Sequence, residues 1–269
     1  MTSAPLPEAT RPTPGTSVRS AARAGAIRTY LRLELRRMLR DRRTLLFSLL
    51  VPPAVFLWVG ASADNQATEV GPGTNLTASL LVSIALFGAL LTSSSGGAGV
   101  AVERAQGWTR QLRLTPLEPW AYVLVKVLAS MTIGGFSVLL TFIAGWFGGA
   151  EMPPVAWALC ALIAWSGSLV FAAFGLLMGY LLPTDSVHKF LNLILAALSF
   201  AGGLFLPFSD GTPMATISQL MPTYGLAELA RAPLGSGSFE IIAVVNVVAW
   251  AAIFFTAAAW RFRKDTARV

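Results

Sequence analysis

The segment from Val155 to Leu182 reads VAWALCALIAWSGSLVFAAFGLLMGYLL and contains no charged side chain. An α-helix of about 20 apolar residues is long enough to cross a hydrocarbon layer about 30 Å thick. A helix buried in a soluble domain is seldom this long without a charge. The segment is therefore predicted to span a membrane.

Five further segments are similarly apolar, and so is the chain as a whole. Hydrophobic residues make up 55% of it and charged residues 12%, with a mean hydropathy of +0.64. A soluble domain of 269 residues needs far more charge to cover its surface. We therefore expect an all-α membrane protein with six transmembrane helices, near residues 44–60, 77–101, 119–147, 155–182, 190–208 and 240–260.

The basic residues indicate how these spans are oriented. Ten arginines precede the first span, whereas the loops 61–76, 148–154 and 209–239 on the opposite side hold only Arg231 of the 20 basic residues. Because Lys and Arg are retained in cytoplasmic loops, both termini are expected in the cytoplasm. Membrane topology thus explains the net charge of +7 without nucleic acid as a partner.

The two ends of the chain differ from its apolar centre. Residues 1–24 are rich in Pro, Ser, Thr, Ala and Arg, which predicts a disordered cytoplasmic tail. Residues 263–269 are predicted to form a short basic tail, so residues 25–262 would be the membrane domain. Arginine outnumbers lysine seventeen to three, which is typical of high-GC bacteria and places the chain in the cell membrane of such an organism.

Residues 27–43 combine an apolar face with a basic one. Apolar residues recur there at helical spacing, and arginines recur every four residues on the other side. A helix of this kind lies in the headgroup region with its cations on anionic lipid. The expected lipid-binding residues are Arg28, Arg32, Arg36 and Arg40.

Reactive side chains are scarce. Cys160 and His188 are single residues in different segments, so neither a metal nor a cofactor is expected in this chain, and no catalytic cluster stands out. The spans carry almost no ionisable residue apart from Lys126, near an inner end, which argues against an ion-coupled carrier. The sequence has no G-x-x-x-x-G-K-[ST] loop, so if ATP drives this protein, a separate subunit binds the ATP and its Mg.

The most polar inner loop follows the second span and reads ERAQGWTRQLRLTPL from Glu103 to Leu117. Charged and apolar residues alternate in it, and Pro116 ends the stretch before the third span. Such a segment suits a short helix that docks in a groove of a cytoplasmic partner. The residues alone are equally compatible with an ordinary amphipathic loop.

This loop resembles the signature of the type-2 permeases of ABC exporters, approximately E-R-E-x-G-T-L-E-x-L-R-x-T-P. That group includes daunorubicin-resistance-like drug exporters and polysaccharide exporters. The resemblance implies a cytoplasmic coupling helix that an ATP-binding subunit contacts. The loop departs from the family pattern at Ala105, Trp108, Thr109 and Arg110, which suggests an altered partner surface rather than a lost one. The implied coupling residues are Glu103, Arg104, Gly107, Trp108, Arg110, Leu112, Arg113, Thr115 and Pro116.

Other stretches support the resemblance, which covers about residues 27–262. The sequence AGGLFLP at 201–207 is similar to the family's fifth-span ending, and MPTYGLAELAR at 221–231 is similar to its outer segment. The resemblance implies short, broken outer helices between spans five and six that close the pathway; a plain outer loop is the alternative. The candidate gate residues are Pro207, Pro222, Tyr224, Glu228 and Arg231.

The function implied is that of a permease subunit in an ATP-driven exporter of a hydrophobic or amphipathic compound, such as a drug, antibiotic or glycolipid. A second permease chain, identical or related, would form the other half of the pathway. Phe87 and Phe200 are candidates for lining it. The alternatives are a stand-alone secondary carrier or channel, a non-transport membrane assembly component, or import rather than export.

Overall fold

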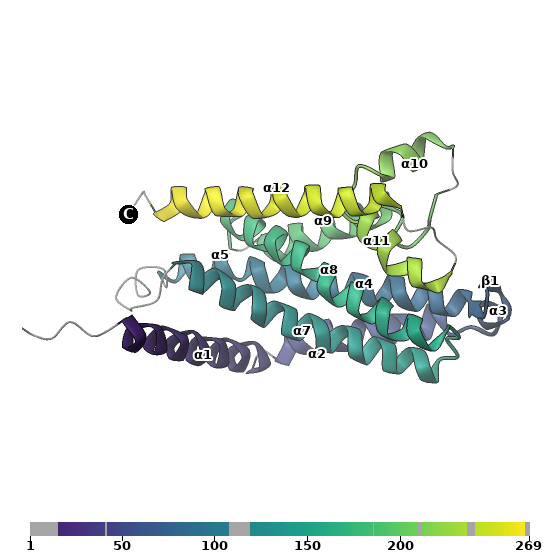
Figure 1. Cartoon of the computed structure of the whole chain (residues 1–269), viewed down its shortest axis with the longest axis horizontal. Helices are drawn as coiled ribbons and strands as arrows, with labels where there is room; N and C mark the ends of the chain where they lie inside the picture. The colour runs from purple at the N-terminus through teal and green to yellow at the C-terminus, as the bar shows by residue number, and fades with distance from the viewer. Residues whose placement is uncertain are drawn as a thin grey trace, which may run out of the picture.

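The structure is a computed structural model of the chain, and it describes residues 16–40, 42–107, 119–184, 186–208, 211–235 and 240–266. Within these residues the fold is all-α apart from one small hairpin, in which β1 (Glu69–Gly71) pairs antiparallel with β2 (Thr74–Asn75). The long helices run side by side along the longest axis of the molecule (Figure 1).

Four helices in the described part of the chain are long and apolar enough to cross a membrane. The first is formed by α4 (Leu76–Ala98) and α5 (Val100–Ala105), and the others are α7 (Pro119–Phe147), α8 (Pro154–Leu181) and α12 (Ile241–Thr266). These helices confirm an all-α membrane protein with several crossings. They correspond to the second, third, fourth and sixth expected spans.

The first expected span is helical but interrupted. Helix α2 (Arg42–Val55) continues into a π-helix, η1 (Phe56–Gly60). Pro52 and Pro53 lie inside α2 and lack the N–H groups that an α-helix requires, so a widened turn follows them. Among the residues whose side chains the structure describes, its apolar helical stretch, Leu49–Gly60, is shorter than the four long helices.

The fifth expected span, placed near 190–208, is also shorter than predicted as a helix. Helix α9 (Val187–Ala201) ends at a pair of glycines. Gly203 has φ +69°, a left-handed conformation that favours glycine and stops the helix. The chain continues to residue 208 without regular helix, so apolar composition extends beyond the helix itself.

Helix α4 forms the centre of the molecule. It packs against α2, α7, α8, α9 and α11. Within the most apolar stretch of each helix, 72% of the α4–α5 residues are buried, against 22% for α12. The backbones of α4 and α8 nearly touch, because a Cβ on Gly175 would lie 2.0 Å from the carbonyl oxygen of Ser94. Small residues therefore permit this close contact, as they do between helices in membranes.

Helix α1 (Thr16–Arg40) packs against α7. It begins within the 1–24 segment that was expected to be disordered, because its alanines and arginines favour helix. Tyr30 and Glu34 are buried, whereas the four predicted lipid-binding arginines are exposed. The helix is thus amphipathic, with an arginine row on its open face.

Short elements gather at the end of the molecule opposite α1 and α5 (Figure 1). Between α9 and α12, two short helices stand in place of a plain loop, and a 3-10 helix follows them. The elements at this end that precede α4 are α3 (Ala63–Ala67) and the β1–β2 hairpin. Those between α9 and α12 are α10 (Pro213–Ser218), α11 (Tyr224–Arg231) and η2 (Ala232–Leu234).

Candidate functional site

Helix α5 carries the first residues of the predicted coupling loop. Glu103 and Arg104 lie in its last turn, and the chain leaves the helix at Gly107. Gly107 has φ +72°, which other residues rarely adopt, so this glycine ends the helix and sets the direction of the loop.

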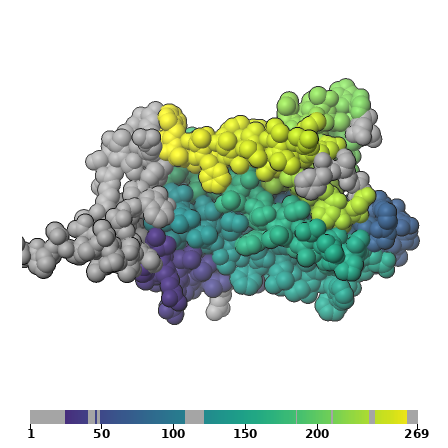
Figure 2. All heavy atoms as spheres, in the orientation of Figure 1, coloured from purple at the N-terminus to yellow at the C-terminus, as the bar shows by residue number. Residues whose placement is uncertain are grey.

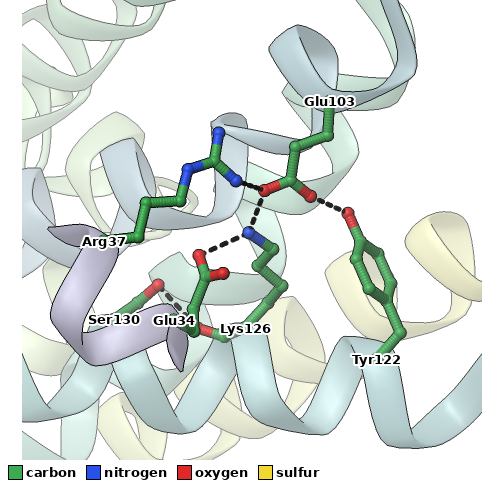
Figure 3. Close-up of polar contacts among 6 residues, drawn as sticks. All are labelled: Glu34, Arg37, Glu103, Tyr122, Lys126 and Ser130. Carbon is green, nitrogen blue, oxygen red and sulfur yellow. Dashed lines mark hydrogen bonds and ion pairs between the residues drawn. The ribbon is translucent and has the colours of Figure 1, made fainter. Parts of the chain in front are cut away.

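The carboxylate of Glu103 is 1% exposed and meets donors from two other helices (Figure 3). Its Oε1 accepts hydrogen bonds from Lys126 Nζ on α7 and from Arg37 Nη1 on α1. Its Oε2 accepts a hydrogen bond from the Tyr122 hydroxyl at 2.5 Å. One buried acid thus joins α5 to both α1 and α7.

Lys126 completes this polar cluster, which comprises Glu34, Arg37, Glu103, Tyr122 and Lys126. Lys126 is 2% exposed, and its Nζ also donates to Glu34 Oε1 at 2.5 Å. Two acids and two bases balance one another in the cluster. Buried charges are tolerated only when they are paired in this way, so the cluster stabilises one arrangement of α1, α5 and α7.

Arg104 points toward a different helix. Its Nη1 donates to the backbone carbonyl of Tyr180 at 3.2 Å and to that of Gly179 at 3.4 Å, and its guanidinium lies 5.4 Å from the centre of the Tyr180 ring. The last carbonyls of a helix lack partners within the helix and carry partial negative charge. Arg104 therefore binds the end of α8 as a cap.

The predicted coupling residues fall into two groups. Glu103, Arg104 and Gly107 are described, and both charged side chains are engaged by their own chain rather than left open to a partner. The remaining six, Trp108, Arg110, Leu112, Arg113, Thr115 and Pro116, lie outside the described residues.

Sequence reasoning missed Glu34, Arg37, Tyr122 and Lys126 as members of a site. Two signals were present in the sequence. Glu34 is the one acid among the bases of residues 27–40, and Lys126 is the one charged residue in the third span. Because charged residues inside membranes nearly always pair, each could have been assigned to the other.

The predicted gate residues lie around α11. Glu228 and Arg231 form an ion pair at 2.7 Å, and Arg231, 8% exposed, also donates to the backbone carbonyls of Gly203 and Leu204. The Tyr224 hydroxyl donates to Glu240 at 3.1 Å. Pro222 is buried before α11, and Pro207 is exposed after the end of α9.

The two candidate lining residues meet through a third aromatic residue that the sequence reading missed. The Phe205 ring lies 5.2 Å from that of Phe87 on α4 and 5.0 Å from that of Phe200 on α9, between ring centres. The Phe200 side chain is 57% exposed. These three rings, the aromatic triad, therefore form one group that reaches the surface.

Long apolar helices with buried polar ties at their ends define a multi-pass membrane protein. Residues 59–261 match the family described as "ABC-2 family transporter protein", so the chain belongs to the ABC-2 family of transporters. It is also similar to the Bacillus subtilis (strain 168) protein named "Putative transport permease YvfS". The two are 28% identical over 212 residues, which cover 78% of this chain and 82% of the relative.

Membership of this family confirms the resemblance to type-2 ABC permeases that the inner loop indicated. The chain is a membrane transport permease, and its family generally works with an ATP-binding subunit.

Proposed function

We propose that this chain is the membrane-spanning subunit of an ATP-driven ABC exporter. A separate subunit binds ATP and Mg and docks on the loop 103–116, so the chain has no ATPase site of its own. The observation that carries this proposal is the burial of Glu103 among Lys126, Arg37 and Tyr122. It connects the root of that loop to the membrane helices.

The cluster gives the loop a means of moving those helices. Glu103 joins the root of the loop to α1 and α7, and Arg104 joins it to α8. Pulling Glu103 away from Lys126 would leave buried charges unpaired, and removing one partner from such a pair costs about 3–5 kcal/mol. We therefore expect a movement of the loop to shift α1, α7 and α8 together with α5. Glu103 and Arg104 therefore transmit the movement, and contact with the partner falls to the residues that follow them.

We also propose six crossings with both termini in the cytoplasm. Helices α2 and η1 form one helical run of about 19 residues, about 28 Å long, which nearly spans the hydrocarbon core. The fifth crossing consists of α9 and the irregular residues after it. Helix α1 and the C-terminal end of α12 lie at the same end of the molecule (Figure 1), as an even number of crossings requires. The cell membrane of a high-GC bacterium remains the expected location.

The exposed arginines of α1 suit anionic lipid at the cytoplasmic surface. The row formed by Arg28, Arg32, Arg36 and Arg40 faces away from α7, while Tyr30 and Glu34 face the bundle. The helix can thus hold lipid headgroups on one side and the polar cluster on the other.

The aromatic triad supports a hydrophobic or amphipathic substrate, such as a drug, antibiotic or glycolipid. Phe200 and Leu206 are 57% and 68% exposed and lie beside the partly buried Phe205. An apolar surface with aromatic rings favours apolar ligands over small ions. The pathway would run between this surface and a second permease chain, in a homodimer or heterodimer.

The proposal is tested by reconstituting the full chain in lipid with a candidate ABC ATP-binding subunit from the same organism. We expect co-purification, ATPase activity that needs both chains, and outward movement of an apolar dye. Glu103→Gln should lower ATP-driven transport at least tenfold, whereas Glu151→Gln, at an exposed acid near the opposite end, should not. Transport without the second subunit would favour a stand-alone carrier, and no change with Glu103→Gln would refute the coupling role.

A further inference from the structure

Helix α12 buries an asparagine in an otherwise apolar stretch. Between Ile241 and Phe255, Asn246 and the indole N–H of Trp250 supply the only side-chain hydrogen-bonding groups. Asn246 is 8% exposed. A polar side chain in the membrane is costly unless it is bound, so its partners indicate why it is there.

Those partners are backbone groups of the short outer helices. Asn246 Nδ2 donates to the carbonyl oxygen of Gln219 at 2.7 Å and to that of Met221 at 3.1 Å. Asn246 Oδ1 accepts a hydrogen bond from the backbone N–H of Gly225 at 3.3 Å. One amide therefore serves both the end of α10 and the first turn of α11, where each helix leaves backbone groups unpaired.

Trp250 also binds the turn between α10 and α11, because its Nε1 donates to the carbonyl oxygen of Leu220 at 3.0 Å. Asn246 and Trp250 lie about 8 and 14 Å along α12 from its first residue. In the proposed topology α12 begins near the outer edge of a hydrocarbon core about 30 Å thick. The turn between α10 and α11 then lies about 8–14 Å inside that edge. An irregular backbone at that depth is tolerated only where protein groups satisfy it, and α12 supplies those groups.

The contact between α11 and α12 is too close for a side chain. A Cβ on Gly225 would lie 2.4 Å from the carbonyl oxygen of Ala243 and 2.9 Å from Asn246 Oδ1. In contrast, α10 is exposed along most of its length, with Met214 and Ile217 53% and 48% exposed. Figure 2 shows α10 protruding beyond α12 at the upper right. The turn held by Asn246 is therefore the principal attachment of α10.

We propose that Asn246 is a positioning residue of the outer segment, by which we mean α10, α11 and the turn between them (residues 213–231). Its hydrogen bonds hold the α10–α11 turn against α12. The outer segment then moves as one body with the last span and does not open as a separate flap. This proposal deepens the exporter function proposed above, because a segment held in this way opens only when α12 moves.

The attachment of the α10–α11 turn by Asn246 can be tested by thiol labelling, an assay that does not depend on transport activity. In a Cys160→Ala background, Ser218→Cys places a near-isosteric thiol on the buried side of α10, at a residue that is 3% exposed. The protein is placed in lipid nanodiscs and treated with a charged maleimide. Asn246→Leu should speed labelling roughly tenfold or more, since it removes three hydrogen bonds. Asn246→Asp keeps the size but offers at most one donor in place of the two N–H groups, and it should do the same.

Two controls separate release of the α10–α11 turn from general loosening. Thr256→Val removes a hydroxyl that bonds only the backbone of α12 itself, and it should leave labelling unchanged. In the chain that keeps its native Cys160, which is fully buried in α8, Asn246→Leu should not speed labelling of that thiol. Unchanged labelling of the Ser218→Cys thiol in both Asn246 variants, or equal acceleration at Cys160, would overturn the proposal.

A second measurement separates this proposal from the exporter function. In the complex with the ATP-binding subunit, Asn246→Leu should keep ATPase activity and lose transport, because the segment no longer follows α12. If the unaltered complex shows no transport, the exporter function fails, while the labelling result still decides whether Asn246 holds the turn.

Discussion

Replacing Lys126 by methionine should destabilise the protein strongly, since Met keeps an unbranched apolar side chain of similar shape and removes the charge. Glu34 and Glu103, 7% and 1% exposed, would then face each other without the ammonium that joins them. Removing one partner from a buried ion pair costs about 3–5 kcal/mol. For a chain of this size that corresponds to a fall of about 10 °C or more in Tm.

The assay is thermal unfolding of the full chain in one fixed detergent. The matched control is Lys189→Met, at an exposed lysine of α9, where we expect a change within about 0.5 kcal/mol. A neutral variant, Glu34→Gln with Glu103→Gln and Lys126→Met, should recover much of the loss, because it leaves no buried carboxylate unpaired. Arg37 can turn to water in that variant, since its side chain is already 50% exposed.

Two results would refute this reasoning. If Lys126→Met changed Tm no more than Lys189→Met, the ammonium would not be holding two buried acids. If the neutral variant were as unstable as Lys126→Met, the loss would come from packing around the side chain rather than from unpaired charge.

Three further substitutions test other parts of the structure. Gly175→Ala should lower the free energy of unfolding by about 1–3 kcal/mol, and with it Tm, because the new Cβ would meet the backbone of Ser94. The control Gly25→Ala, with open space around its Cβ, should not lower Tm. Arg231→Met should cost about 3 kcal/mol in thermal unfolding, because the carbonyls at the end of α9 lose their donor and Glu228 its cation. Glutamine at all four exposed arginines of α1 should remove about 1 kcal/mol per charge of preference for anionic over neutral lipid, measured by lipid retention at low and high salt. Those arginines are Arg28, Arg32, Arg36 and Arg40.

The long helices could be predicted closely from the sequence. Spans expected at 119–147 and 155–182 correspond to α7 (Pro119–Phe147) and α8 (Pro154–Leu181), because unbroken apolar runs with Pro at the start have one stable form in a membrane. The first and fifth expected spans, near 44–60 and 190–208, were predicted less well. Apolar composition measures preference for lipid, and it does not report where Pro52 or Gly203 interrupts the backbone.

The polar cluster and the contact of Arg104 with α8 could be predicted only in part. The loop pattern identified Glu103 and Arg104, but it could not indicate which way their side chains point. Glu103 meets Arg37, 66 residues away, and Lys126, 23 residues away, so the pairing depends on how α1 and α7 pack. The same holds for Asn246, whose partners became visible only when α12 was placed against the α10–α11 turn.

The two ends of the molecule are tied to different helices, and this difference predicts where movement occurs. The root of the inner loop is held to α1, α7 and α8, and α8 is locked to α4 by backbone contact at Gly175. The outer segment is held to α12, the least buried long helix, and to the end of α9. We call the elements joined by these contacts the inner body (α1, α4, α5, α7 and α8) and the outer body (α10, α11 and α12). The two bodies meet where α11 and α12 pack against α8 and α11 packs against α4.

Spin labels can measure whether the two bodies move relative to each other. Labels at Ala105 and Leu181, both exposed, report distances within the inner body, and these should stay constant between the nucleotide-free and ATP-bound complexes. A label at Val248, 61% exposed on α12, reports the outer body, and its distance to Leu181 should change. A change between Ala105 and Leu181, with a constant distance from Leu181 to Val248, would mean that the loop root bends and that the polar ties do not transmit the movement.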